Sequence, residues 1–448
     1  MWIMSKKRFY TILFMLMIGG IIGYFVILIQ PFVLNEKEEE TEQEPQTEDK
    51  VEITFWRNYG NEAENQAYNQ IISDFHQIHP NITVNMQNVE YNNYEVKLRT
   101  EIVTEKGPDV MAIDSPYLAL YAESGVLTPL DHYLSSSDDV QDDFSEQVME
   151  GLIYNDQQYL MPLIESSIAL YYNIPLLEDA GISLPSKDPS QPLTWEETIE
   201  MVKTAQSPKD GVYGIDPAQG FGNGEAPAYF KLPFLWQFGA EVLNPEGTTA
   251  SGYLDSPEAI SALQFYQDLY HEDKVAEREI PAEAFQKNQL VMTVLGSWAI
   301  TEFENNGFVL GEDFGIAPLP KAEYQVTPNG SWALGMSSNT EYPEEAWEFI
   351  RYVTSYEATK KYVTITGDIP ARYSVAESLP VYNKYPYNIF AEQAYLHSKN
   401  RPVTPAYPVI SRAIKELFEN IGLANQDVET SVAEAVETIN QRLAEIEP

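Results

Sequence analysis

The residues of this sequence that could do acid–base or metal chemistry are mainly Asp and Glu. Its 448 residues include 68 Asp and Glu but only five His and no Cys. Without Cys, thiolate nucleophiles, thiolate metal sites and disulfides are excluded. His76 and His79 are spaced to share a metal on a helix, but no third ligand is suggested nearby, so a polar helix end is favoured. We therefore predict no metal site and no cofactor.

Sugar chemistry remains open because carboxylates are so abundant. A glycoside hydrolase needs two carboxyl groups ~5 to 10 Å apart, and a sequence cannot place such a pair. The motifs HExxH, GxxxxGK[ST] and GxSxG do not occur. A secreted glycoside hydrolase is therefore the less favoured alternative. Binding without catalysis needs only aromatic faces and hydrogen-bonding side chains.

Two strand ends supply side chains of that kind. Trp56, Arg57 and Asn58 end the first predicted strand with an aromatic ring, a guanidinium and an amide. Core packing is the alternative for Trp56. Asp114 and Ser115 end a later strand and begin a helix, so helix capping is the alternative there. Ligands bind at such strand ends in open α/β sheets.

The net charge of -41 restricts the partners. A strongly negative field repels nucleic acid and anionic lipid surfaces, and it disfavours polyanionic ligands. We expect no nucleic-acid partner.

The N-terminal residues 9 to 29 form 21 consecutive uncharged, mostly apolar positions. As a helix they would be about 31 Å long, enough to span a bilayer core of about 30 Å. Three basic residues precede them, which predicts a cytoplasmic N-terminus. We predict a membrane anchor over residues 1–35, with cleavage as a signal peptide as the alternative. Residues 36–50 are acidic and almost without apolar side chains, which predicts a disordered tether.

The body from residue 51 onward alternates strand and helix signals. VEITFW (51–56), a helical pattern over 61–80 and ITVNMQNV (82–89) predict a β-α-β unit with a parallel sheet. Thr194 and Glu197 have the spacing of a capping box. From residue 340 onward the patterns are mainly helical. These features predict an α/β fold.

Nine segments in order over about residues 51–443 resemble one family. They include VEITFWRNYG, GPDVMAIDSPYLALYAESGVLTPLD, VMTVLGSWAITEF, NGSWALGMSSNTEYPEEAWEFIRYVTS, GDIPAR and a tail that begins RPVTPAYPVIS. The resemblance is to the extracellular solute-binding proteins of ABC importers, in the large sugar-binding family that includes the maltose-binding protein. Members from Gram-positive bacteria usually carry a lipobox cysteine, which this chain lacks. The predicted helix would replace it as a single-pass anchor in the cell membrane, with the body on the extracellular face.

The resemblance implies a two-lobed periplasmic-binding-protein-like fold of type II, with the solute in the cleft. Lobe one is predicted at 51–163 plus 331–375, and lobe two at 164–330 plus 376–448. The implied function is capture of a sugar or oligosaccharide by a monomer that closes around it and delivers it to a membrane permease. A non-sugar solute is the alternative. No reaction is implied.

The resemblance also implies further ligand contacts. Relatives place a carboxylate near Glu165 and Ser166, and Ser166 falls closest to that place. Trp298 most resembles the family's stacking tryptophan. The other residues implied by the resemblance are Tyr229, Trp236, Asn329, Gly330, Trp332 and Arg372. Core packing is the alternative for Tyr229 and Trp236, and a salt bridge between the lobes is the alternative for Arg372.

Overall fold

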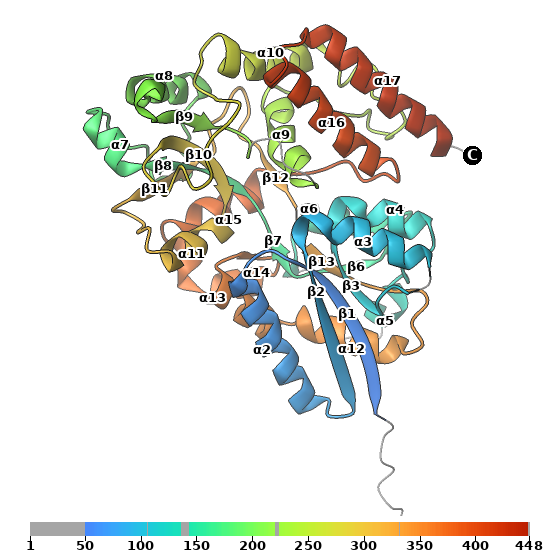
Figure 1. The fold of residues 1–448 in the computed structure, drawn as a ribbon. Helices are drawn as coiled ribbons and strands as arrows, with labels where there is room; N and C mark the ends of the chain where they lie inside the picture. The colour runs from blue at the N-terminus through green and yellow to red at the C-terminus, as the bar shows by residue number, and fades with distance from the viewer. Residues whose placement is uncertain (1–49, 105, 136–142, 220–223, 331, 447–448) are drawn as a thin grey trace, which may run out of the picture. The chain divides into compact units, whose positions relative to one another are not determined.

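The computed structural model describes residues 50–104, 106–135, 143–219, 224–330 and 332–446 (Figure 1). The predicted anchor and almost all of the predicted tether lie outside these ranges. Within them, no helix has the length and apolarity needed to cross a membrane.

The first sheet begins with the β-α-β unit that the sequence predicted. β1 (Val51–Tyr59) pairs in parallel with β2 (Ile82–Glu90), and α2 (Glu62–Ile78) connects them. Asn61 caps α2, because its side chain accepts a hydrogen bond from the Glu64 N–H at 2.9 Å. The sheet order is β2-β1-β3-β13-β6. The other strands are β3 (Val110–Asp114), β13 (Trp332–Met336) and β6 (Leu160–Pro162).

The second sheet has the order β11-β8-β10-β9. Its strands are β8 (Ile168–Asn173), β9 (Tyr213–Asp216), β10 (Leu290–Gly296) and β11 (Phe314–Pro318). The helices near it in the chain are α7 (Ile174–Asp179), α8 (Trp195–Ala205), α9 (Ala226–Gln237), α10 (Pro257–His271) and α11 (Trp298–Asn305). Thr194 and Glu197 form the predicted capping box of α8.

Two layers of helices cover the first sheet. Alternate residues of β3 point to opposite faces, where Ala112 joins one apolar cluster and Ile113 another. One face packs against α2, α12 (Pro343–Val353) and α13 (Tyr356–Thr366), and the other against α3 (Tyr91–Val103) and α4 (Leu118–Glu123). The short helices α5 (Asp131–Ser135) and α6 (Glu146–Glu150) and the hairpin of β4 (Ile153–Tyr154) and β5 (Gln157–Gln158) complete this region.

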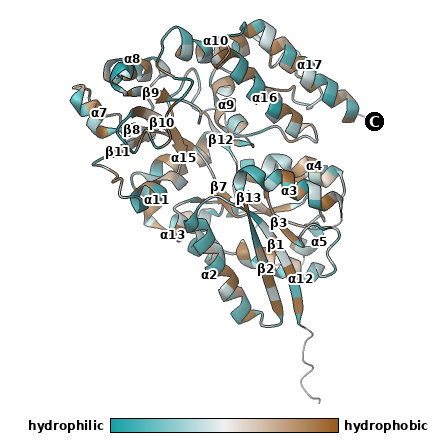
Figure 2. Cartoon of the chain, viewed as in Figure 1, coloured by the Kyte–Doolittle hydropathy of each residue, from teal (hydrophilic) through white to brown (hydrophobic). Residues whose placement is uncertain are grey.

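The C-terminal helices belong mainly to the second sheet. α16 (Tyr407–Gly422) packs against α9, α10 and α17 (Val428–Ile446), and these helices share the cluster that contains Leu170 of β8. α15 (Tyr387–Leu396) contacts β8 and β11 instead, and α14 (Tyr373–Ser378) precedes it. Figure 2 shows brown, hydrophobic segments on the strands and more teal on the helices. The chain therefore has two α/β lobes, one around each sheet.

Short ladders join the sheets where the chain passes between them. β7 (Ile164–Glu165) pairs with β14 (Ile369–Pro370), and β12 (Thr327–Asn329) pairs with β15 (Ser398–Asn400). The predicted lobe limits at residues 163, 330 and 375 lie at or near these ladders. The limits themselves stay a prediction.

Candidate functional site

A cavity of about 560 Å³ is lined by residues from both lobes. Such a volume suits a small-molecule ligand. It takes in the ends of β1, β3 and β10 and the starts of α3, α9 and α11. The predicted site residues among its lining are Asn58, Asp114, Glu165, Ser166, Tyr229, Trp298, Gly330 and Trp332.

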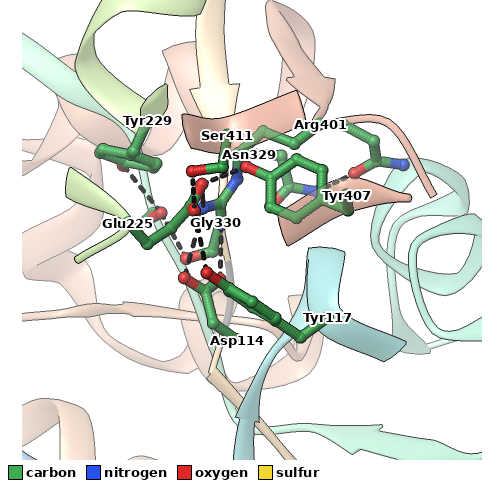
Figure 3. A network of polar contacts seen from close by, with 11 residues as sticks. Asp114, Tyr117, Glu225, Tyr229, Asn329, Gly330, Arg401, Tyr407 and Ser411 are labelled. Atoms are coloured by element: carbon green, nitrogen blue, oxygen red, sulfur yellow. Dashed lines mark hydrogen bonds and ion pairs between the residues drawn. The ribbon is translucent and has the colours of Figure 1, made fainter. Parts of the chain in front are cut away.

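The centre of the site is a buried ion-pair network, shown in Figure 3. Arg401, which directly follows β15, donates to both carboxylate oxygens of Asp114, at 2.5 and 3.2 Å. The same guanidinium donates to Glu225 Oε1 at 2.8 Å. Asp114 ends a strand of the first sheet, whereas Glu225 directly precedes α9 near the second. Arg401 therefore bonds carboxylates from both lobes.

Hydroxyl groups complete the shell around Glu225. Ser411 Oγ donates to Glu225 Oε2 at 2.6 Å, and Tyr117 OH donates to the same oxygen at 3.3 Å. Tyr407 OH donates to Oε1. Burial raises the pKa of Glu225, while the charge of Arg401 lowers it and that of Asp114 raises it further. Two carboxylates thus share one guanidinium.

A second chain of hydrogen bonds lies beside Arg401. Tyr229 OH donates to Ser166 Oγ at 2.9 Å, and Ser166 Oγ donates to the Gly330 carbonyl at 2.7 Å. The Arg401 guanidinium lies 5.2 Å from the centroid of the Tyr229 ring. A Cβ on Gly330 would lie 2.6 Å from Arg401 Nη2 and 2.7 Å from the Tyr229 ring. Glycine is required there because both groups approach the backbone closely.

Two half-buried tryptophans line the cavity. Trp298 begins α11, and its ring centroid is 6.4 Å from that of Tyr229. Trp332 begins β13 and meets Tyr91 and Tyr94 edge-on, with centroids 6.3 and 5.9 Å apart. Flat aromatic surface of this kind can stack on the C–H face of a sugar.

Glu165 lines the cavity but is 1% exposed. Neither of its carboxylate oxygens has a hydrogen-bond partner among the described residues. Burial raises the pKa of Glu165 well above its usual range, which favours the neutral acid.

Arg57 is fully buried behind the cavity. Its Nη2 pairs with Glu64 Oε2 at 2.9 Å, its Nε donates to the Asn58 carbonyl at 2.6 Å, and its guanidinium stacks over Tyr68. Glu64, not Arg57, lines the cavity. Arg57 therefore positions Glu64.

The structure places five other predicted residues outside the cavity lining. Trp56 lies under Lys97 Nζ, which is 4.6 Å from its ring, and Ser115 is buried at the start of the turn after β3. Trp236 is buried in the apolar cluster around the second sheet, and Asn329 donates to Asn400 at 2.8 Å. Arg372 pairs with Asp143 at 3.1 Å and donates to the Thr354 carbonyl at 2.6 Å. Both of those partners lie in predicted lobe one, so these bonds do not join the lobes.

Several lining residues were not predicted. They include Glu64, Tyr91, Gln219, Glu302, Asp368 and Arg401. Arg401 opens the RPVTPAYPVIS segment that carries part of the resemblance, and that segment was the available signal. Asp368 lies in GDIPAR and Glu302 in VMTVLGSWAITEF, which also carry part of the resemblance. Glu64, Tyr91 and Gln219 lie on segments with no distinguishing pattern.

A second cavity of about 550 Å³ adjoins the first. The two share Tyr91, Asn92, Asp114 and Trp332 in their linings, and the second lies between α3 and α16. The cleft therefore extends beyond Trp332.

Removing the shared cation tests the network. We expect Arg401→Met to lower the free energy of unfolding by about 3 to 5 kcal/mol, because Asp114 and Glu225 would stay buried without a counter-charge. Urea unfolding measures the change. Arg412→Met, on an exposed side chain of α16, is the control and should change it by less than about 0.5 kcal/mol. A loss below about 1 kcal/mol for Arg401→Met would contradict the role given to the network.

The pKa of Asp368 predicts a pH dependence. Burial raises it from 3.8 to about 6, so the folded state binds this proton more tightly than the unfolded state does. The stabilisation is full below pH 3.8 and is lost as the pH rises through 6. As the pH rises between these limits, the free energy of unfolding of wild type should fall by about 1 to 3 kcal/mol relative to that of Asp368→Asn. Parallel urea titrations from pH 4.5 to 7.5 would show this, and equal slopes would refute it.

Comparison with known proteins identifies the family. Residues 59–360 match the family described as bacterial extracellular solute-binding protein. A maltotriose-binding protein of Pyrococcus abyssi is 23% identical over 381 residues, covering 82% of this chain and 78% of that protein. A mannitol-binding protein of Pseudomonas aeruginosa is 30% identical over 297 residues, covering 63% of this chain and 64% of that protein.

A solved structure has the same fold. An ABC transporter solute-binding protein of Thermotoga lettingae, crystallised with α-D-tagatose, superposes with a TM-score of 0.78 at 26% identity, covering 88% of this chain and 100% of that one. The relatives are binding proteins and not enzymes, as the sequence predicted. This chain belongs to the bacterial extracellular solute-binding protein family.

Proposed function

We propose that this protein captures a sugar or oligosaccharide outside the cell and delivers it to the permease of an ABC importer. The observation that carries the proposal is the cavity between the lobes, where Trp298, Trp332 and Tyr229 supply aromatic surface. Ser166, Gln219 and Asn58 add hydroxyl and amide groups to the same lining. This combination suits a ring with apolar faces and a belt of hydroxyls.

The ligand size follows from the adjoining cavity. Because the two cavities share Trp332 and Tyr91, a chain of several sugar units could extend from one into the other. The maltotriose-binding relative supports an oligosaccharide. The mannitol-binding relative favours a polyol as the second candidate, since a polyol presents similar hydroxyls without a ring face.

Closure of the lobes is the mechanism that we propose. A ligand that touches both lobes binds the closed form better and shifts the population toward it. A permease that recognises both lobes at their closed spacing would then distinguish loaded from empty protein. In this account no bond of the sugar is broken, and the importer's ATPase supplies the work.

A ligand screen followed by a distance measurement tests this function. Thermal shift on the full chain in detergent should identify a sugar, because a ligand of the folded state raises the melting temperature. The chain lacks cysteine, so Thr100→Cys on α3 and Glu416→Cys on α16 would be the sole dye sites. Energy transfer between the dyes should change with the sugar. An unchanged signal at saturation would contradict closure, and release of product sugar would favour the hydrolase.

Trp298 is the aromatic platform to test first. Trp298→Ala should weaken sugar binding by about 1 to 3 kcal/mol, roughly 5-fold to over 100-fold, because stacking area is lost. Calorimetry measures the affinity. Trp56→Ala, outside the cavity lining, is the control and should bind normally. Normal affinity in Trp298→Ala would exclude it as a ligand contact.

The anchor is a further part of the proposal. The apolar run at 9 to 29 and the basic residues before it support a retained single-pass helix, with a monomeric body on the extracellular face. We expect the full chain to sediment with membranes and to keep its N-terminus, as checked by Edman sequencing or mass spectrometry. Recovery of a mature protein that begins between residues 30 and 50 would overturn the anchor and favour a cleaved signal peptide.

A further inference from the structure

We propose that the cleft selects a sugar that carries a basic nitrogen, with its ammonium group held by Glu64 and Asp368. The inference rests on the proposed function, sugar binding, and narrows the substrate class. An amino sugar with a free amine is the simplest ligand of this kind.

The charge of the cavity lining is strongly one-sided. Among the described lining residues Arg401 is the one basic side chain, and Asp114 and Glu225 already hold it. The lining also has six carboxyl side chains, from Glu64, Glu90, Asp114, Glu165, Glu302 and Asp368. A phosphate, sulfate or uronate would meet these carboxyls without an unpaired cation to receive it. The part of the ligand that occupies this cavity is therefore neutral or positively charged, whereas the adjoining cavity is also lined by Arg99, Arg412 and Lys415.

Glu64 and Asp368 decide between these two possibilities. Asp368 is 4% exposed, and its carboxylate receives hydrogen bonds from neutral hydroxyl groups, those of Thr366 and of Ser297, the latter at 3.5 Å. No Lys or Arg of the described chain forms an ion pair with it. Glu64 has the Arg57 guanidinium, which lies behind it and does not line the cavity. Two neighbouring carboxyl groups thus have one cation.

The raised pKa values of Glu64 and Asp368 are consistent with two carboxyl groups that have too little positive charge near them. The pKa of Glu64 is raised to about 7, chiefly by burial; the charge of Arg57 lowers it and that of Asp368 raises it. Burial raises the pKa of Asp368 to about 6. A neutral ligand that excludes water makes it more costly for these carboxyl groups to be charged. An ammonium group lowers that cost because it pairs with the charge. A hydroxyl can donate to these carboxylates, but it supplies no compensating charge.

The backbone around these carboxyls holds them in place. Gly60 lets the Glu64 carboxylate lie against the main chain, since a Cβ there would be 2.4 Å from Glu64 Oε1. Ser297, which contacts Asp368, directly precedes Trp298. Trp298 is therefore the residue next to a contact of Asp368, and the face of its ring can also attract a cation.

Matched sugars that differ at the nitrogen test the proposal. Calorimetry on the full chain in detergent would compare chitobiose and chitotriose, which have free amines, with their N-acetylated forms, with maltose and maltotriose, and with digalacturonate. We expect the free amines to bind at least 10-fold more tightly than the N-acetylated forms. Digalacturonate should not bind.

Three variants locate the effect. Asp368→Asn should remove most of the preference for the free amines over the N-acetylated forms. Glu302→Gln, on an exposed side chain of the same lining, should lower the preference a few-fold and tests the charge even if Asp368→Asn does not fold. Glu312→Gln, on an exposed carboxylate outside the lining, should preserve the preference.

The outcomes separate this inference from the proposed function. If maltose or an N-acetylated sugar binds as tightly as the amines do, or if Asp368→Asn keeps the preference, the amine assignment is wrong and sugar capture stands. If no sugar in the panel binds, neutral ones included, both fail.

Discussion

One buried guanidinium forms ion pairs with both lobes. Arg401 donates to a carboxylate from each side, Asp114 at the end of β3 and Glu225 at the start of α9, and it also lies against the Tyr229 ring. A charge this deeply buried is tolerated only when it is paired and hydrogen-bonded. The positions of Ser411, Tyr117 and Gly330 follow from that requirement, since each either hydrogen-bonds the network or leaves room for it.

The same requirement shapes the ligand cavity. Because Asp114 and Glu225 form ion pairs with Arg401, this guanidinium is not an unpaired cation in the cavity, and the remaining carboxyls set the charge of the lining. Glu64, Asp368 and Glu165 all have a raised pKa, and burial is the largest cause for each. Burial of acids costs stability unless a ligand or a proton offsets it. The buried carboxyl groups of the binding cleft therefore lower the stability of the fold.

The connection between the lobes has a different physical basis. It includes short ladders of two or three residues, whereas each lobe has its own sheet with helices packed against it. Few hydrogen bonds need to change when such a connection bends, while the sheets resist bending. The apolar cluster that contains Ala112 nevertheless includes both Phe55 of β1 and Tyr171 of β8, so the lobes share packing away from the cleft.

The sequence by itself determined the local elements and the family. Periodicity predicted the β-α-β start, Thr194 and Glu197 predicted a cap, and ordered segments predicted the two-lobed fold, because these signals depend on residues near one another in the chain. Trp298, Ser166 and Tyr229 were predicted in the same way and line the cavity. Tertiary structure alone decided that Arg57 lies behind Glu64, that Arg372 bonds Asp143, and that Arg401 pairs with Asp114, 287 residues away. Pairing over 229 residues, as for Arg372 and Asp143, or over 287, as for Arg401 and Asp114, depends on how the sheets pack, and no local pattern encodes it.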